Sequence, residues 1–152
     1  TPEVAPAPST VALDNGHGNG RLRVLVAEDD HVNQMVVEEM LKRLGCEVDV
    51  TADGQAAREA AARRRYDIVF MDCHMPLMDG YEATRRIRSG ENAQGRRRRP
   101  IGALTADTLQ SDRERCLDAG MDDFLSKPVS RAQLAATISR WTGRRTRPVT
   151  QW

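Results

Sequence analysis

The chain has 152 residues, with 39% hydrophobic and 30% charged side chains and a formal net charge of +1 at pH 7. This length suffices for one domain with a sizeable core, and the nearly neutral charge argues against a protein that mainly coats nucleic acid or an anionic membrane. No apolar run reaches membrane-spanning length. The three cysteines, Cys46, Cys73 and Cys116, lie far apart and lack zinc or redox spacing, which predicts a reducing, cytoplasmic compartment.

Three segments are expected along the chain. Residues 1–20 are rich in Pro, Gly and Asn, and we expect a flexible linker there. Residues 21–142 carry the periodic apolar pattern of a folded domain, and residues 143–152 form a basic tail. Because the chain begins with Thr1 rather than Met, we expect it to be a fragment of a longer protein.

Five short runs predict the strands of a sheet, at residues 24–27, 47–51, 68–71, 101–105 and 123–127. The run Ile68–Met71 is continuously apolar, which is typical of a strand covered on both faces. Residues 47–51 alternate polar and apolar instead, which indicates a half-covered edge strand.

Five helices are predicted between and after these strands. Apolar or small side chains at helical spacing, among them Val36, Leu117 and Trp141, indicate helices at about 36–44, 54–61, 80–87, 109–119 and 130–141. Gly45 is placed to end the first helix, and Ser130 with Gln133 forms a capping box for the last. We expect residues 89–100 to form a polar loop in which Arg96–Arg99 are solvated, and docking of a partner on these arginines is the alternative.

The alternation of strands and helices predicts an α/β fold, with a five-stranded parallel sheet covered by helices on both faces, of the flavodoxin-like (βα)5 type. Placing the alternating strand at an edge gives the strand order 2-1-3-4-5. The switch point then lies between the first and third strands, which end in Glu28-Asp29 and in Asp72. We therefore expect three carboxylates in one crevice at the carboxyl edge of the sheet.

Three clustered carboxylates need a compensating charge. Two unit charges about 4 Å apart repel by roughly 4 kcal/mol at an effective dielectric constant near 20. The carboxylates therefore take up protons or hold a cation, and hard oxygen ligands in an open site favour Mg²⁺. Alternatively, Glu28, Asp29 and Asp30 only cap the helix that follows, a role for which Asp30 is best placed.

Two further strand ends add complementary groups. The fourth strand ends in Thr105, a hydroxyl donor, and the fifth ends in Lys127, which Pro128 follows. Together with the carboxylates, these side chains could position a phosphoryl group on Asp72 and neutralise its oxygens. Positioning and charge neutralisation are most of what phosphoryl transfer requires of a protein.

Four motifs, in this order, resemble those of receiver domains of the two-component response-regulator family. They are VLVAED at 24–29, MDCHMPLMDGYEAT at 71–84, ALTA at 103–106 and AGMDDFLSKP at 119–128. The resemblance covers about residues 22–141. The second and fourth motifs are most similar to those of receivers attached to hybrid sensor histidine kinases.

The resemblance implies the following roles for the acidic residues. Asp72 is the aspartate that accepts a phosphoryl group from a phosphohistidine. Asp29 and Asp72 ligate Mg²⁺ together with the backbone carbonyl of His74, and Glu28 acts through water. Glu28 stands where aspartate is more usual, and its extra methylene alters the metal geometry slightly.

The resemblance also implies that Lys127 pairs with a phosphoryl oxygen, while Thr105 and the backbone N–H of Ala106 bind others. The Lys127–Pro128 bond is expected to be cis. Phe124 occupies the position of an aromatic residue that turns inward on activation, and it lacks the hydroxyl of the more frequent tyrosine.

Two residues near the phosphoryl group are expected to tune its lifetime. His74 and Asp107 each lie two residues beyond a site residue and border the path by which water attacks the phosphoryl group. The readout face should comprise the fourth helix, the fifth strand and the fifth helix.

The expected function is that of a phosphorelay receiver whose partner is a histidine kinase or a histidine phosphotransfer domain. Direct contact with nucleic acid or membrane is not expected of this chain, and a weak dimer is left open. Outside self-phosphorylation from a donor and slow autodephosphorylation, no conventional enzyme activity is expected of the domain itself. We expect a cytoplasmic location, with a tether to the inner membrane if the parent protein is a sensor kinase.

The same residues bear on four other classes of protein. A degenerate receiver that binds partners without being phosphorylated is the main alternative, and the complete acidic, Thr and Lys positions argue against it. A haloacid-dehalogenase-type hydrolase would have an acid where His74 stands, and a nucleotide or flavin site would need glycines where residues 28–30 stand. A DNA-binding regulator has only the arginines at 96–99 and in the tail (Arg144, Arg145 and Arg147) in its favour.

Overall fold

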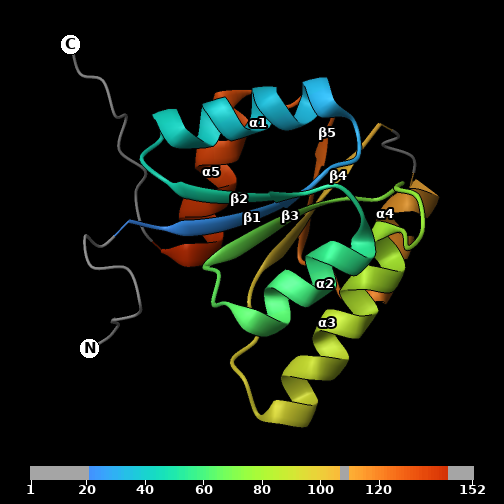
Figure 1. Cartoon of the computed structure of the whole chain (residues 1–152). Helices are drawn as coiled ribbons and strands as arrows, with labels where there is room; N and C mark the ends of the chain where they lie inside the picture. The colour runs from blue at the N-terminus through green and yellow to red at the C-terminus, as the bar shows by residue number, and fades with distance from the viewer. Residues whose placement is uncertain (1–20, 107–109, 144–152) are drawn as a thin grey trace.

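The structure is a computed structural model that describes residues 21–106 and 110–143. The predicted linker, Asp107, Leu109 and the tail beyond Gly143 lie outside the described residues. In the described part, five strands alternate with five helices (Figure 1). In chain order they are β1 (Arg23–Ala27), α1 (His31–Arg43), β2 (Glu47–Thr51), α2 (Gly54–Arg63), β3 (Ile68–Asp72), α3 (Gly80–Gln94), β4 (Ile101–Thr105), α4 (Gln110–Ala119), β5 (Asp123–Ser126) and α5 (Arg131–Thr142).

The five strands form one parallel sheet in the order β2-β1-β3-β4-β5, which confirms the predicted α/β topology. The register aligns Ala27 of β1 with Met71 of β3, and Asp72 of β3 with Leu104 of β4. The ends of β1, β3 and β4 therefore lie side by side at the carboxyl edge of the sheet. The strand β2 lies at an edge as expected, although its five residues are all half-buried instead of alternating.

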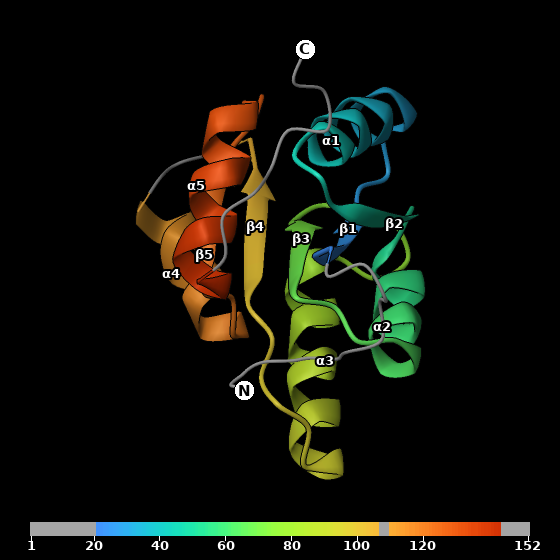
Figure 2. The ribbon, with the colours of Figure 1, turned by 90° about the vertical axis from the view of Figure 1, so that its left-hand side faces the viewer.

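Helices cover both faces of the sheet (Figures 1 and 2). One core cluster joins the sheet to α2, α3 and α4 through residues such as Ala57, Ile87 and Cys116. The other joins it to α1 and α5 through residues such as Leu41 and Ile138. The strand β3 is buried along its whole length, as its continuous apolar run indicated.

Three predicted end signals are confirmed. Asp30 caps α1, because its Oδ1 accepts a hydrogen bond of 3.0 Å from the backbone N–H of Asn33. Gly45 follows α1 with a positive φ of 87°, and Ser130 with Gln133 forms the capping box of α5. These local signals fix where the chain leaves and enters its helices.

The prediction that the third helix ends at Ile87 is wrong, because α3 continues to Gln94. Ser89 is exposed, so a polar residue there does not interrupt the packing. The helix continues because Glu91 is buried and binds basic partners, and it ends at Gly95, whose φ is +64°.

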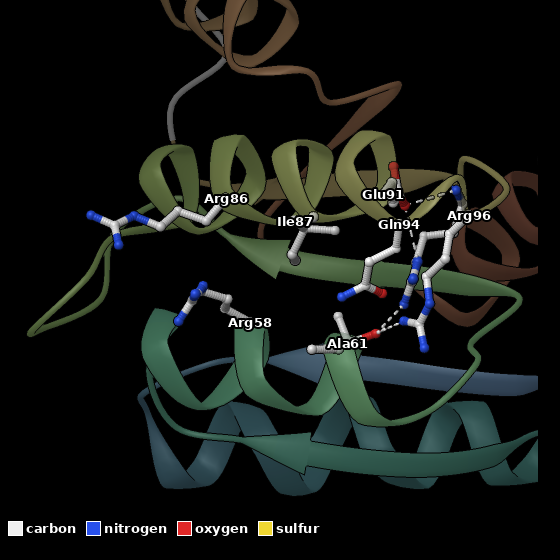
Figure 3. Close-up of a pocket in the computed structure, with 10 residues that line it drawn as sticks. Arg58, Ala61, Arg86, Ile87, Glu91, Gln94 and Arg96 are labelled. Atoms are coloured by element: carbon white, nitrogen blue, oxygen red, sulfur yellow. Dashed lines mark hydrogen bonds and ion pairs between the residues drawn. The ribbon is translucent and has the colours of Figure 1, made fainter.

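The prediction that Arg96–Arg99 are solvated is wrong for Arg99, whose side chain is only 8% exposed. Its guanidinium donates to Glu91 Oε2 at 3.0 Å and to the carbonyl oxygen of Ala61 at 2.8 Å. Arg96 donates to the same carbonyl oxygen at 3.1 Å (Figure 3). This part of the loop therefore ties α3 to the end of α2.

Three apolar residues that helped to predict helices are not in the core: Val36, Leu117 and Trp141 are 45%, 56% and 39% exposed. Trp141 lies over β5 instead, where its indole N–H donates to Asp123 Oδ2 at 2.9 Å. Helical spacing located these helices correctly but did not tell which apolar side chains face the sheet. Among the described residues, no helix is both long and apolar enough to cross a membrane.

Candidate functional site

Three acidic side chains meet at the carboxyl edge of the sheet, as predicted. Glu28 and Asp29 follow β1, and Asp72 ends β3. One carboxylate oxygen from each lies within 4.8 Å of the others. Glu28 and Asp72 are buried, at 1% and 3% exposure, whereas Asp29 is exposed. With Lys127 these three residues form what is called the acidic site below.

Glu28 is fixed by contacts to both of its carboxylate oxygens. Its Oε2 accepts a hydrogen bond of 3.0 Å from the backbone N–H of Asp30, and its Oε1 lies 2.9 Å from Lys127 Nζ. The backbone of Glu28 is held as well, because its N–H donates to Thr51 O and its carbonyl accepts from Gln34. A buried carboxylate held in this way has one orientation.

Asp72 lies between a backbone donor and a cation. The N–H of His74 donates to its Oδ1 at 3.2 Å, and Lys127 Nζ lies 3.1 Å from its Oδ2. Burial nevertheless raises the pKa of Asp72 to about 6, and the neighbouring charge of Glu28 adds to this rise against the lowering effect of His74 and Lys127. The contacts with His74 and Lys127 therefore do not fully compensate for the burial of the negative charge on Asp72.

Lys127 is the cation that the acidic site holds. Burial lowers the pKa of Lys127, but its contacts with Glu28 and Asp72 outweigh burial and raise the pKa overall. Three carboxylates face one ammonium, which leaves an excess of negative charge. Such a set of hard oxygen ligands fits a divalent cation of the Mg²⁺ class.

Lys127 and Thr105 are brought together by the pairing of β4 with β5. The backbone N–H of Lys127 donates to the carbonyl oxygen of Thr105 at 2.8 Å, and Thr105 is paired with Ser126 in the sheet. Thr105 is buried, and Ala106 after it is exposed. The Lys127–Pro128 peptide bond is cis, as expected.

The loop from β3 to α3 folds back closely on the strand end. Gly80 donates its N–H to Cys73 O at 3.0 Å, and a Cβ on Gly80 would lie 2.1 Å from Asp72 O, so only glycine fits there. Leu77 has a φ of +69°, which is unfavourable for a residue with a Cβ, and its side chain is 89% exposed. The loop therefore presents a strained, exposed leucine near the site.

Of the remaining predicted residues, His74 lies in this loop and Phe124 lies on β5. His74 is exposed, and its ring meets the ring of Tyr81 edge to face at 6.0 Å between centroids. Phe124 on β5 is half-buried, and the Arg113 guanidinium of α4 lies 4.6 Å from its ring centroid. Asp107 lies outside the described residues.

Two features near the site were missed from the sequence. Cys73 and Cys116 are in contact, with 3.8 Å between their sulfur atoms, although 43 positions separate them. Val32 and Met35 on α1 are 66% and 58% exposed. The position of these two residues could have been found from the helical pattern, because they lie off the face that carries Val37. No sequence spacing indicates the cysteine contact.

A cleft lies between α2 and α3 (Figure 3), and none of the residues that line it belongs to the acidic site. Its volume is about 100 Å³, and its lining includes Ala61, Ile87 and Glu91. Small-molecule sites are usually about 300–1,000 Å³. The cleft is therefore too small for a typical cofactor.

Known proteins are similar to this chain over most of the described part. The family model of the response regulator receiver domain matches residues 24–139. Hybrid signal transduction histidine kinase L of Dictyostelium discoideum is 40% identical over 122 residues, which make up 78% of this chain and 7% of that protein. The chain therefore spans less than a tenth of the length of this curated relative.

Two solved structures are similar to the fold. One is the receiver domain of sensor histidine kinase PA1611 from Pseudomonas aeruginosa PAO1, which has a magnesium ion coordinated in its active site cleft. It is 51% identical to this chain with a TM-score of 0.74, and the match covers 82% of this chain and 99% of that one. The other is the receiver domain of Ssk1 from Saccharomyces cerevisiae, crystallised with the histidine phosphotransfer protein Ypd1. It is 29% identical to this chain with a TM-score of 0.78, and the match covers 81% of this chain and 90% of that one.

Proposed function

The chain belongs to the response regulator receiver domain family, and we propose from this that it is the phosphoacceptor of a two-component phosphorelay, with Asp72 taking the phosphoryl group. The observation that carries the proposal is the buried Asp72 carboxylate at the switch point, with its raised pKa and its contact to Lys127. The parent is proposed to be a hybrid sensor histidine kinase, because such proteins are among the relatives.

In the proposed step, a carboxylate oxygen of Asp72 attacks the phosphorus atom of a phosphohistidine on the donor. The new P–O bond forms as the P–N bond breaks, and the imidazole nitrogen of the donor keeps the electron pair. Lys127 is 3.1 Å from Asp72 Oδ2 and is placed to pair with a phosphoryl oxygen. The hydroxyl of Thr105 and the backbone N–H of Ala106 are proposed to bind the others.

The acidic site fits Mg²⁺, the ion seen in the PA1611 receiver domain. Asp29, Asp72 and the backbone carbonyl of His74 would hold it. Glu28, whose Oε2 accepts from the backbone N–H of Asp30 and whose Oε1 contacts Lys127, is proposed to act through water. When bound, the ion supplies positive charge that neutralises the phosphoryl oxygens.

The phosphoryl group is proposed to switch the face formed by α4, β5 and α5. One charge-assisted hydrogen bond from Thr105 would contribute about 1.5–3 kcal/mol, which shifts a two-state equilibrium roughly 10- to 150-fold. Phe124 would turn inward in the same transition. We further propose that His74 and Asp107 tune the lifetime of the phosphoryl group. An unchanged dephosphorylation rate after substituting both would refute that role.

The phosphohistidine donor, a histidine kinase or a histidine phosphotransfer domain, is proposed to dock on exposed apolar side chains around the site. Val32, Met35 and Leu77 are 66%, 58% and 89% exposed, and such residues favour protein contacts. Substituting Met35→Asp should slow phosphotransfer from a protein donor about tenfold or more, since it places a charge in the interface. The rate with a small acyl phosphate should not change, and an equal loss with both donors would contradict docking at α1.

The test of the phosphoacceptor is incubation with Mg²⁺ and a small acyl phosphate, followed by intact mass. Wild-type protein should gain one phosphoryl group, and Asp72→Asn should gain none because the nucleophilic carboxylate is gone. Asp30→Asn is the matched control, because asparagine also caps a helix and Asp30 is not a proposed ligand. Wild-type incorporation in Asp72→Asn would place the phosphoacceptor elsewhere, and none in folded wild type would favour the degenerate receiver.

A further inference from the structure

Two free thiols lie in contact beside the phosphoacceptor. Cys73 follows Asp72 at the end of β3, and Cys116 projects from α4. Their sulfur atoms are 3.8 Å apart, and both residues are buried, at 0% and 1% exposure. Cys46 is also buried, but it belongs to the core cluster on the opposite face of the sheet.

The helix α4 is held to the sheet by few side chains. Among residues 112–119, only Cys116 and Ala119 are buried, whereas Arg113, Arg115 and Leu117 are exposed. An element with so few buried contacts opens locally at low free energy. Opening of α4 would give a small oxidant access to both sulfur atoms, and Cys116 lies at the point where the helix is attached.

The surroundings favour a reactive sulfur at Cys116. Its contact with Cys73 lowers the pKa of the Cys116 thiol, against burial, with help from Tyr81 and Arg115. The Tyr81 hydroxyl is buried near both sulfur atoms, yet it forms no well-aligned hydrogen bond within the described residues. The Arg115 guanidinium lies 4.2 Å from the Tyr81 ring centroid and adds positive charge.

We propose that Cys73 and Cys116 form a reversible disulfide when the protein meets a peroxide, and that this bond fixes α4 to the strand end that carries Asp72. The sulfur atoms must approach from 3.8 Å to a bond length of about 2.05 Å. The thiolate of Cys116 attacks one peroxide oxygen, the O–O bond breaks, and a sulfenic acid forms. Cys73 then attacks that sulfur and water leaves, so two thiols and one hydrogen peroxide give one disulfide and two waters.

The disulfide has a defined consequence for the switch. It would close the chain between β3 and α4 and suppress the opening of α4, which belongs to the proposed readout face. Formation of the bond does not depend on the phosphorelay proposal, whereas its effect on switching does. The measurements below therefore use no phosphodonor, so that failure of one proposal is distinguishable from failure of the other.

The first experiment treats the native, reduced chain with hydrogen peroxide, blocks the remaining thiols and reads the intact mass and the peptide map. We expect a monomer that has lost two hydrogen atoms, a Cys73–Cys116 cross-linked peptide, and full reversal by dithiothreitol. Cys46→Ser should behave like wild type, and Cys116→Ser should form no internal cross-link. The peptide map of wild type identifies the bond even if Cys116→Ser fails to fold. Two unlinked thiols, a bond to Cys46 or a bond between chains would overturn the proposal.

The second experiment compares amide hydrogen exchange in the reduced and oxidised proteins. The α4 amides should exchange at least about tenfold more slowly after oxidation, because the local opening is suppressed. The α1 amides, on the opposite face of the sheet, serve as the internal control and should not change. Equal exchange of α4 in both forms would show that the disulfide does not restrain this helix.

Discussion

Two groups of charges, each with buried members, lie at opposite edges of the sheet, and they differ in how completely they are paired. At the carboxyl edge, the acidic site sets three carboxylates against the single ammonium of Lys127. At the amino edge, Arg88, Glu91, Arg99 and Asp122 form a cluster of two cations and two anions, which is called the amino-edge cluster below, and the exposed Arg98 pairs with Asp122 at 2.6 Å from outside it. The first has an excess of negative charge, whereas each acid of the second is paired with at least two arginines.

The amino-edge cluster also satisfies its hydrogen bonds. The Arg88 guanidinium donates to Glu91 at 3.0 Å and to Asp122 at 2.7 Å, and it reaches the carbonyl oxygens of Gly120 and Arg99. Asp122 accepts in addition from the N–H of Ile101, where β4 begins. Burial lowers the pKa of Arg99 even so, against the effect of Glu91, which shows that the arrangement has an electrostatic cost. Charges that are each paired and hydrogen-bonded indicate architecture, whereas an unbalanced group of carboxylates indicates chemistry.

The largest effect on stability is expected when a charge is removed from the amino-edge cluster. Glu91→Gln leaves Arg88 and Arg99 without their shared carboxylate in a buried site. We expect a loss of about 3–5 kcal/mol in the free energy of unfolding, and a fall in Tm of roughly 10 °C. Thermal unfolding measured by circular dichroism checks this.

The matched control is Glu82→Gln, on the same helix, where Glu82 pairs with the exposed side chains of Arg85 and Arg86. Its Tm should stay essentially that of wild type. Folded Glu91→Gln should bind Mg²⁺ with wild-type affinity below its Tm. A Tm equal to that of Glu82→Gln would mean that the amino-edge cluster does not stabilise the fold.

The corresponding change in the acidic site is Asp29→Asn, which removes an exposed carboxylate. We expect Mg²⁺ affinity to fall about 10- to 100-fold, because one of the proposed ligands loses its charge, with little loss of stability in metal-free buffer. Titration of Mg²⁺ followed by calorimetry measures both. Asp30→Asn, one residue along, should bind Mg²⁺ as wild type does. A similar loss in the two variants would show that general charge, and not ligation, attracts the ion.

The strand ends of the acidic site could be predicted from the sequence because each is marked locally. Apolar runs stop at Glu28, Asp72 and Thr105, and the alternating strand identifies the sheet edge and thereby the switch point. In a parallel sheet, strand order alone then brings these ends together. The order of strands and the meeting of the three carboxylates were therefore correct.

The amino-edge cluster could not be predicted because nothing in the sequence sets its arginines apart from their neighbours, and because Asp122 lies 34 positions from Arg88. Arg99 is neighboured by arginines of which Arg97 and Arg98 are exposed, and only the fold distinguishes it from them. Its partner Glu91 lies in a stretch with serine, glycine and asparagine, which looks like a loop. The contact of Cys73 with Cys116 was invisible for the same reason. Periodic patterns report which face is apolar and do not report which polar groups are paired.

The smallest expected effect is on the stability of Asp72→Asn as a function of pH, which tests whether the charges of the acidic site are unbalanced. The pKa of Asp72 in the folded chain, about 6, lies above its ordinary value of 3.8, so folding takes up a proton between these two pH values. The ionised carboxylate therefore destabilises the metal-free fold above pH 6, and this effect fades as the pH falls towards 4. The rise in the pKa of Asp72 to about 6 lowers the free energy of unfolding by at most about 3 kcal/mol. Because Asp72→Asn also loses the contact with Lys127, we expect its free energy of unfolding to exceed that of wild type by only about 1–2 kcal/mol. Without Mg²⁺, we expect Asp72→Asn to have a higher Tm than wild type at pH 7.5 and nearly the same Tm at pH 4. Added Mg²⁺ should narrow the difference in Tm at pH 7.5, because it stabilises wild type alone. A lower Tm for Asp72→Asn than for wild type at pH 7.5 would show that the charges of the acidic site are as well balanced as those of the amino-edge cluster. The proposed difference in charge pairing between the two edges of the sheet would then be wrong.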